Sequence, residues 1–297
     1  MGLKRNILKR VVCLQKADKQ HLFTLEEATD MQAKTLRYLI RRAKITAFGD
    51  HYQFPEIAES KEYLNLFRNR VPIHTYNDMY VRWWYRSLNG ETYVTWPGKI
   101  KYYLTKDIHQ QITGKTIPVS RAILRSYLVA GERYYSMCDS DKLNVKSVGS
   151  PPLDNYKTYY GGTLAAILSH HNPLRYKWCL ENCFVYENTN REKDFLLTDV
   201  GLVGLRYGEH GNFRLIVDNS LFYEFLPMKI SSKPDKEFIK SETKHTITLH
   251  EIEEDKDYIL LLTNNSGAWR YFTGQIVRFT NREHLEFMVL GKVKVSK

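Results

Sequence analysis

Long apolar runs and cysteines are both scarce in this sequence. Among its 297 residues, no apolar stretch approaches the roughly 20 residues that cross a bilayer, so we expect no membrane span. The basic start of the chain lacks the apolar centre of a secretory signal. Four cysteines in a chain of this length do not make a disulfide framework. These absences predict a cytoplasmic protein in a reducing environment.

Acidic residues are in deficit, because 33 Asp and Glu stand against 44 Lys and Arg and give a formal charge of +11. Such a surplus favours anionic partners through phosphate contacts and counterion release. The basic residues are spread along the chain rather than blocked, which is typical of a solvated surface. Nucleic-acid binding stays open as an alternative, and it is not the leading hypothesis.

Helical spacing dominates the first half of the chain and strand patterns the second. Thr24 and Glu27 form a capping-box pattern ahead of apolar residues spaced three and four apart up to Ala43, which predicts a helix that Gly49 ends. Further helices are expected over 2–16, 61–67, 78–88, after Ser120, and over 163–170. Strands are expected over 93–96, 100–104, 215–217, 221–226, 246–249, 258–262, 269–272, 275–279 and 287–290. This order predicts an α/β or α+β fold with a β-rich C-terminal half.

Several stretches occur in the order and spacing of one known family. Residues 71–78 read VPIHTYND, residues 96–102 read WPGKIKY, and residues 117–120 read IPVS. Towards the other end, residues 221–228 read LFYEFLPM and residues 267–271 read GAWRY. Together they resemble the Gretchen Hagen family of auxin-responsive acyl-acid amido synthetases, which belong to the adenylate-forming enzymes.

The resemblance implies an α/β fold: an adenylate-forming-like N-terminal domain with helices packed on sheets. It implies one large domain over residues 1–297, helical over 1–135 and β-rich over 195–297. The sequence stops at Lys297, where the family continues into a mobile C-terminal lid domain, so we expect that lid to be absent. A piece of the family's middle, around 175–205, is also missing. Family members activate a carboxylic acid with ATP and Mg²⁺ as an acyl-adenylate and pass the acyl group to an amine.

The family's first nucleotide motif is a loop of the form SSGTTxGxxK. Glycines in such a loop let backbone N–H groups approach phosphate oxygens, and hydroxyls add further donors. Residues 106–115 fill this place with KDIHQQITGK, where only Lys115 is retained. A P-loop is excluded as well, because His109 stands where that motif needs a glycine. We expect this segment not to cradle a triphosphate in the family manner.

The other family motifs are altered too. Glu209, within YGEHG, is the nearest match to the acid of YxASEG. Tyr271 belongs to RYFTGQ, in which Gln275 replaces the ribose-binding aspartate of RYxxGD and loses its charge-assisted hydrogen bonds. Lys292 stands for the arginine of the GRTK hinge and lacks its bidentate fork. By resemblance, Lys115 and Lys292 would neutralise phosphate, Tyr271 would flank base or ribose, and Glu209 would hold a metal or orient the acyl carboxylate.

With all these motifs degraded together, we expect an impaired or inactive enzyme, a pseudoenzyme that keeps the family fold. No catalytic residue is assigned, and ATP and Mg²⁺ are the cofactors only if family activity remains. The alternatives are a binding module for a small carboxylate or a protein partner, a truncated remnant without activity, and nucleic-acid binding through the aromatic and arginine residues of 76–86. The spacing of His170, His171, Cys179 and Cys183 does not match a zinc site, so no metal is expected.

Overall fold

The computed structural model describes residues 23–107, 111–128, 152–173, 195–206, 212–228, 238 and 241–293. The chain divides into two compact units. The larger unit consists of Phe23–Ile100 and Lys193–Lys297, and the smaller one of Met1–Leu22 and Lys101–Glu192. The helix expected over residues 2–16 lies outside the described residues. The single domain expected over residues 1–297 stays a prediction.

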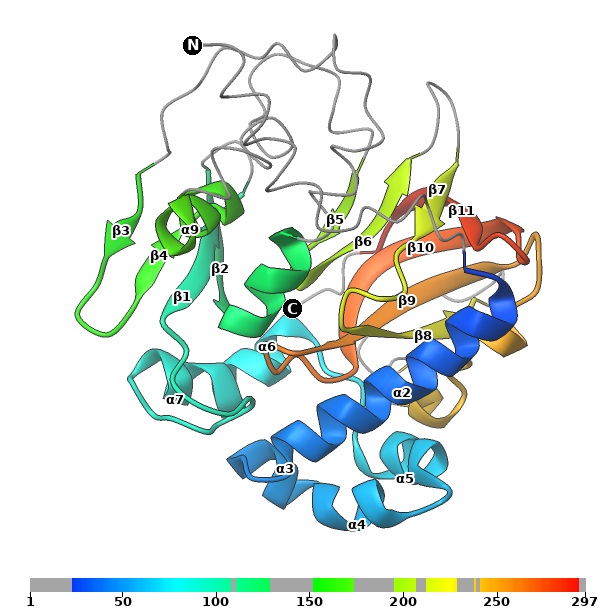
Figure 1. The fold of residues 1–297 in the computed structure, drawn as a ribbon, viewed down its shortest axis with the longest axis horizontal. Helices are drawn as coiled ribbons and strands as arrows, with labels where there is room; N and C mark the ends of the chain where they lie inside the picture. The colour runs from blue at the N-terminus through cyan, green and yellow to red at the C-terminus, as the bar shows by residue number, and fades with distance from the viewer. Residues whose placement is uncertain are drawn as a thin grey trace, which may run out of the picture. The chain divides into compact units, whose positions relative to one another are not determined.

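Helices fill the first part of the larger unit (Figure 1). They are α2 (Leu25–Ala43), α3 (Ala47–His51), α4 (Phe54–Glu59), α5 (Tyr63–Arg70), α6 (Tyr76–Met79), the π-helix η1 (Tyr80–Trp84) and α7 (Tyr85–Leu88). The predicted capping box begins α2: Glu27 N–H donates to Thr24 Oγ1, and Thr24 N–H donates to the Glu27 carboxylate. The helix ends at Ala43 rather than at Gly49, because Thr46 caps the separate helix α3 through the Gly49 N–H.

A seven-stranded sheet forms the rest of this unit, with strand order β5-β6-β7-β11-β10-β9-β8 and every neighbouring pair antiparallel. The strands are β5 (Phe195–Thr198), β6 (Gly201–Arg206), β7 (Phe213–Leu215), β8 (Leu221–Pro227), β9 (Asp257–Asn264), β10 (Tyr271–Asn281) and β11 (Glu286–Lys292). Two 3-10 turns, η5 (Glu242–Lys244) and η6 (Leu249–Glu251), lie between β8 and β9 in sequence. The expected β-rich C-terminal part is therefore confirmed.

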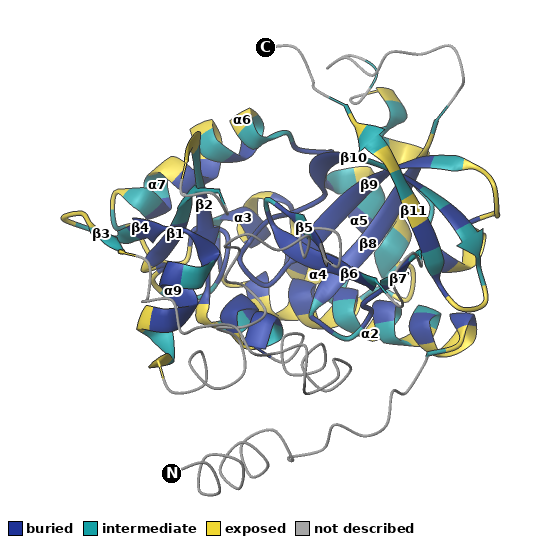
Figure 2. Cartoon of the chain, turned by 90° about the horizontal axis from the view of Figure 1, so that it is seen from above, coloured by how far each residue is buried: buried dark blue, intermediate teal, exposed yellow. Residues whose placement is uncertain are grey.

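Helices cover the β8 side of this sheet, where α2 packs against β8 (Figure 1). Strands β8 and β9 are buried along almost their whole length, so both of their faces are covered (Figure 2). Gln32 of α2 fastens helix to strand: its Nε2 donates to Val217 O and Leu221 O, and its Oε1 accepts from Tyr223 N. An aromatic core, in which Phe48 stacks on Trp269 at 5.5 Å between ring centroids, joins α3 to the segment before β10.

The smaller unit holds a four-stranded mixed sheet with order β2-β1-β4-β3. Its strands are β1 (Tyr102–Lys106), β2 (Ile112–Val119), β3 (Asp154–Asn155) and β4 (Tyr160–Gly162), of which β1 and β4 are parallel. Helix α9 (Leu164–His171) follows Thr163, whose Oγ1 accepts from Ala166 N. Ser120 caps a helix over residues 121–128 in the same way, through the Ile123 N–H. Both helices were predicted from the sequence, the one after Ser120 from its cap.

Two strand predictions are wrong, and a third is displaced, because the strand expected over 215–217 is β7 and ends at Leu215. Residues 93–96 form bends, because Tyr93 has φ +57° and the carbonyls of Tyr93 and Val94 accept from Ala47 N and Phe48 N at the start of α3. Residues 246–249 make only an isolated bridge between Ile247 and Phe225 before η6 begins. The strands expected over 269–272 and 275–279 are one strand, β10, interrupted by a register shift. In each case, partners distant in sequence determine the outcome.

Candidate functional site

Two of the family-like segments lie side by side in the larger unit. His74, within VPIHTYND, forms a parallel bridge with Tyr271. His74 N–H donates to Arg270 O at 3.0 Å, and Phe272 N–H donates to His74 O at 2.9 Å. The segment before α6 thus bridges to the first residue of β10, ahead of the part of β10 that pairs with β11, and this places α6 and η1 next to the RYFTGQ stretch.

Tyr271 is almost fully buried, with 1% of its surface exposed. Its hydroxyl donates to Asp199 Oδ2 at 3.2 Å, and its ring stacks on Trp84 at 5.8 Å between centroids. Burial, followed by the Asp199 carboxylate, raises the pKa of Tyr271 well above its usual value. Trp84 therefore covers one face of the ring, and Asp199 engages the hydroxyl. The predicted role of Tyr271 beside a base or ribose stays a prediction.

Lys292 and Gln275 are directly opposite each other on β11 and β10. Val293 N–H donates to Gly274 O at 2.7 Å, which holds the end of β11 against the turn of RYFTGQ. Lys292 is exposed and Gln275 is half-buried. The structure therefore brings together two of the altered motifs: Gln275 stands for the aspartate of RYxxGD, and Lys292 stands for the arginine of GRTK.

Lys115 belongs to the smaller unit, where it lies half-buried in β2. Leu104 pairs with Ile117 and Lys106 pairs with Ile112, so Thr105 alone faces residues 113–116 and the strand bulges there. Gly114 adopts φ +68° in this bulge, and Lys115 N–H donates to Thr113 Oγ1 at 3.2 Å. Glu209, the remaining predicted residue, lies outside the described residues. The site assigned to these residues stays a prediction.

Arg270, next to Tyr271, is a central residue to which sequence reasoning gave no role. Its Nε donates to Glu224 Oε2 at 3.0 Å, and its other nitrogens donate to the carbonyls of Arg68, Val71 and Thr243. The Thr246 hydroxyl accepts from Arg270 and donates to the second Glu224 oxygen. A lone glutamate within the apolar run LFYEFLP was the available signal, because a buried charge needs a partner.

His74 and Tyr52 form a second buried polar contact. His74 Nδ1 lies 2.9 Å from Trp269 O, which can only accept, so Nδ1 carries the proton. Nε2 is then the acceptor for the Tyr52 hydroxyl at 3.2 Å. Burial is the main cause that lowers the pKa of His74 to about 4, so the ring is neutral at physiological pH.

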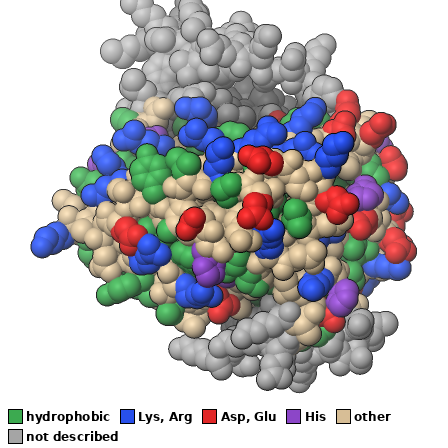
Figure 3. Space-filling view, turned by 90° about the horizontal axis from the view of Figure 1, so that it is seen from below, with side chains coloured by type: hydrophobic (Ala, Val, Ile, Leu, Met, Phe, Trp, Pro, Cys, Tyr) green, Lys and Arg blue, Asp and Glu red, His purple; other side chains and the backbone are tan. Residues whose placement is uncertain are grey.

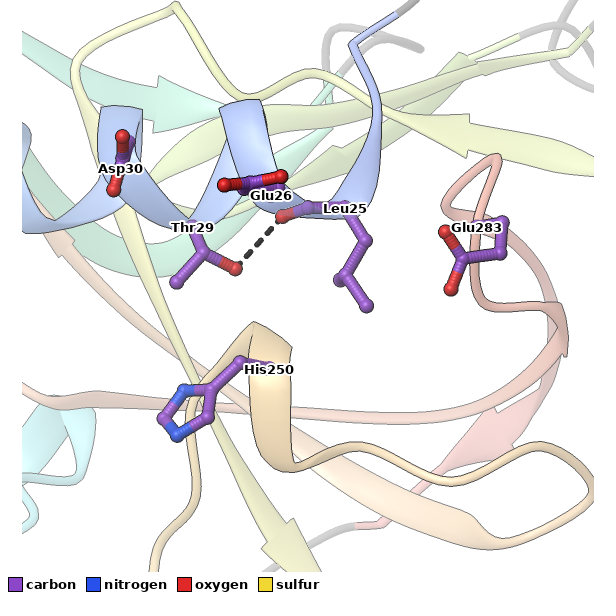
Figure 4. Close-up of a pocket in the computed structure, with 6 residues that line it drawn as sticks. All are labelled: Leu25, Glu26, Thr29, Asp30, His250 and Glu283. Atoms are coloured by element: carbon purple, nitrogen blue, oxygen red, sulfur yellow. Dashed lines mark hydrogen bonds between the residues drawn. The ribbon is translucent and has the colours of Figure 1, made fainter.

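A hollow of about 480 Å³ lies at the start of α2. Leu25, Glu26, Thr29 and Asp30 line it from the helix, with His250 and Glu283 across from them (Figure 4). None of the predicted site residues lines this hollow. Three of its six lining side chains are acidic, which makes it unsuited to the phosphate groups of a nucleotide.

The other predictions from the sequence concern a metal site, nucleic-acid binding and a membrane span, and the described residues bear on each of them. The described residues contain no cluster of three or more His, Cys, Asp and Glu side chains that could hold a metal, and Cys179 and Cys183 lie outside them. Trp83 and Trp84 are buried, so these aromatic residues pack in the core as the family match favours. On the face drawn in Figure 3, basic and acidic side chains are interspersed rather than gathered into one patch. No helix within the described ranges is long and apolar enough to cross a membrane.

Comparison with known proteins agrees with this architecture. A family model described as the GH3 family N-terminal domain matches residues 19–149, and one for the GH3 family central domain matches residues 214–287. The fold is that of the adenylate-forming acyl acid amido synthetases. This chain belongs to the GH3 family, which confirms the Gretchen Hagen resemblance.

Two solved structures are similar over most of the chain. The GH3.15 acyl acid amido synthetase has a TM-score of 0.65 at 12% identity and covers 92% of this chain and 69% of its own. The AtGH3.15 acyl acid amido synthetase in complex with 2,4-DB has a TM-score of 0.63 at 12% identity, covering 91% and 69%. At this identity the likeness shows the fold alone. A search of curated protein sequences finds no match.

Proposed function

We propose that this chain keeps the fold of an acyl acid amido synthetase but is impaired or inactive in ATP-dependent adenylation of carboxylic acids. The proposal combines its family membership with the chemistry of the segment that replaces the phosphate loop. In that segment, described residues make internal hydrogen bonds through groups that a phosphate loop would direct at its ligand.

The single observation that carries the proposal is the position of the Asp107 carboxylate. Asp107 Oδ1 accepts from Gln111 N–H at 2.9 Å, so a negative charge is held within the ten residues that take the place of the phosphate loop. A carboxylate beside a triphosphate raises the free energy of binding through like-charge repulsion. The Lys115 amide is also engaged with Thr113 rather than directed at a ligand. Gln275 supports the same conclusion, because it offers ribose hydroxyls no charged acceptor.

A non-catalytic binding module is the alternative within this proposal, with a small carboxylate or a protein as its partner. Nucleic acid is a weaker alternative, supported by the charge of +11. We also propose a cytoplasmic location, on the basis of the few cysteines and the absence of a long apolar run in the sequence.

The test is calorimetric titration with ATP and Mg²⁺, followed by pyrophosphate exchange with a panel of aryl and alkyl carboxylic acids. We expect no saturable heat with ATP, and exchange at the level of a protein-free control. GH3.15 acyl acid amido synthetase, assayed in parallel, shows that the conditions support activity. Acid-dependent exchange that disappears in Lys115→Ala would overturn the proposal and assign Lys115 to the nucleotide site.

The same titrations separate the alternatives. Binding of a carboxylic acid without ATP binding identifies a ligand-binding pseudoenzyme. Binding of nucleic acid that weakens steeply with salt identifies phosphate contacts instead. A protein that binds none of these calls for a search for protein partners.

A further inference from the structure

The indole of Trp83 carries an N–H group without a hydrogen-bond partner. Only 5% of the Trp83 surface is exposed, and its Nε1 has no acceptor among the described residues. By contrast, Trp84 Nε1 donates to Gly267 O and Trp269 Nε1 donates to Thr95 O. Since most buried donors in folded proteins are paired, an unpaired indole N–H calls for an explanation.

Basic side chains surround this indole. The Cζ atoms of Arg82 and Arg86 lie 5.9 and 5.7 Å from the Trp83 ring centroid, and the His51 ring centroid lies 5.5 Å from it. Arg86 is neutralised by Glu91, to which its Nε donates at 2.8 Å. Among the described residues, no carboxylate lies within ion-pair distance of Arg82, which is exposed. Arg82 therefore has charge to offer a ligand.

The π-helix η1 creates this arrangement. Its wider turn allows the consecutive residues Trp83 and Trp84 to be buried together, while Arg82 stays at the surface beside them. Single π-helical turns of this kind are frequent at functional sites. His51, at the end of α3, is exposed on the neighbouring element.

Two other polar side chains near this indole, Tyr52 and Asp78, are already engaged. The Tyr52 hydroxyl donates to His74, so it has no proton left for a ligand. Asp78 Oδ2 accepts from both the amide and the hydroxyl of Thr75 in a capping box. The Asp78 charge acts on the Tyr52 hydroxyl together with that of Arg82, so it weakens any anion bound here.

We propose that Trp83 Nε1, Arg82 and His51 form a binding site for a small oxyanion of the size of phosphate or sulfate. An indole N–H and a guanidinium can only donate, and oxyanion oxygens are the acceptors that this pair lacks. The N–H is covered in the unliganded arrangement, so the exposed side chains of Arg82 and His51 turn outward to admit the anion and then contact it from the solvent side. The site uses none of the residues of the altered nucleotide motifs and does not depend on the proposed loss of adenylation.

The experiment is a titration of the full chain, ¹⁵N-labelled at its tryptophan indoles, with sodium phosphate against sodium chloride at constant ionic strength. Trp83→Phe assigns the Trp83 signal. We expect a saturable downfield shift of the Trp83 indole proton, with a dissociation constant on the order of millimolar because Asp78 opposes the anion. The Trp84 and Trp269 signals should not move, since their N–H groups are already paired.

Arg82→Gln should weaken phosphate binding by about tenfold, because one charge-assisted contact is lost. Arg37→Gln is the matched control: Arg37 is exposed and its Cζ lies 4.2 Å from the Tyr63 ring centroid, so it too loses one charge and one ring contact. Should Trp83→Phe fail to fold, calorimetry of the wild type and the two arginine variants gives the same comparison. A shift without saturation, an unmoved Trp83 signal, or equal weakening in both arginine variants would overturn the site.

Discussion

Arg270 and Glu224 form an ion pair that is closed off from solvent, with Arg270 Nε 3.0 Å from Glu224 Oε2 and side chains that are 0% and 1% exposed. The pair connects β8 to the residue that precedes β10, and Arg270 adopts φ +45°, a left-handed conformation that is uncommon for a non-glycine residue. Through three carbonyls, Arg270 also fixes the end of α5 and the η5 turn. The neighbouring Tyr271 is held in position by this network.

Arg270→Met should lower the free energy of unfolding by about 3–5 kcal/mol, because it leaves a buried carboxylate without its main counter-charge. Urea denaturation followed by circular dichroism measures the change. The control is Arg278→Gln, which breaks the half-exposed pair with Asp257 and should leave stability nearly unchanged. Equal losses in the two variants would show that the buried pair contributes no more than the surface one.

Gly267→Ala should destabilise the larger unit more than Gly98→Ala does. Both glycines are left-handed, with φ of +82° and +89°, so both substitutions add strain of about 1–2 kcal/mol. Only at position 267 would the new Cβ lie 2.6 Å from Thr95 Cβ and 2.8 Å from a backbone carbon, whereas nothing lies within 4 Å at Gly98. The midpoint temperatures of thermal unfolding compare the destabilisation in the two variants. Gly291→Ala, which also has no neighbours within 4 Å, serves as the baseline. Equal midpoints for Gly267→Ala and Gly98→Ala would argue against a clash with Thr95 at position 267.

His74 should make stability depend on pH. Burial lowers its pKa from 6.5 to about 4, so between these values the unfolded chain binds a proton that the folded chain does not. The stability that depends on neutral His74 is fully present above pH 6.5 and is lost as the pH falls towards 4. Over this range the free energy of unfolding changes by up to about 1.4 kcal/mol per pH unit.

His74→Asn isolates this effect, because it keeps a donor for Trp269 O but does not titrate. Urea denaturation at a series of pH values gives the free energy of unfolding of the wild type and of the variant. The contributions of other histidines cancel in the difference between the two. The difference should narrow as the pH is lowered from 6.5 to 4. A difference that is constant over that range would mean that folding does not lower the pKa of His74.

Gln32→Leu should lower the free energy of unfolding by roughly 3 kcal/mol or more, since it leaves the amide of Tyr223 and the carbonyls of Val217 and Leu221 without partners. Lys34→Leu is the control, because it places the same side chain at an exposed position of the same helix. Chemical denaturation gives the free energy of unfolding of both variants. If Lys34→Leu lowers it as much as Gln32→Leu does, the contacts of the Gln32 amide do not account for the loss of stability.

Local features of the structure were predictable from sequence. The capping box of Thr24 and Glu27, and the caps at Ser120 and Thr163, begin helices where the pattern places them. Buried strands such as β8 and β9 were visible as apolar runs. These features depend on neighbours a few residues away, so the sequence contains all the information that they need.

The candidate site was only partly predictable. Family resemblance indicated the segments that carry Tyr271 and Lys292, and β10 and β11 place Gln275 opposite Lys292. The roles of Arg270, Asp199 and Trp83 were missed, because each depends on a partner that is distant in the chain or on a π-helical turn without a sequence signature.

The sequence by itself therefore determined the family, the order of helices and strands, and the chemical losses in the nucleotide motifs. Only the tertiary structure decided which charged and polar groups are buried and what pairs with them: Glu224 with Arg270, His74 with Tyr52, and Trp83 with nothing among the described residues. The physical reason is that burying a charge or a hydrogen-bonding group costs free energy unless a partner meets it, and those partners come from parts of the chain that meet only in the folded state.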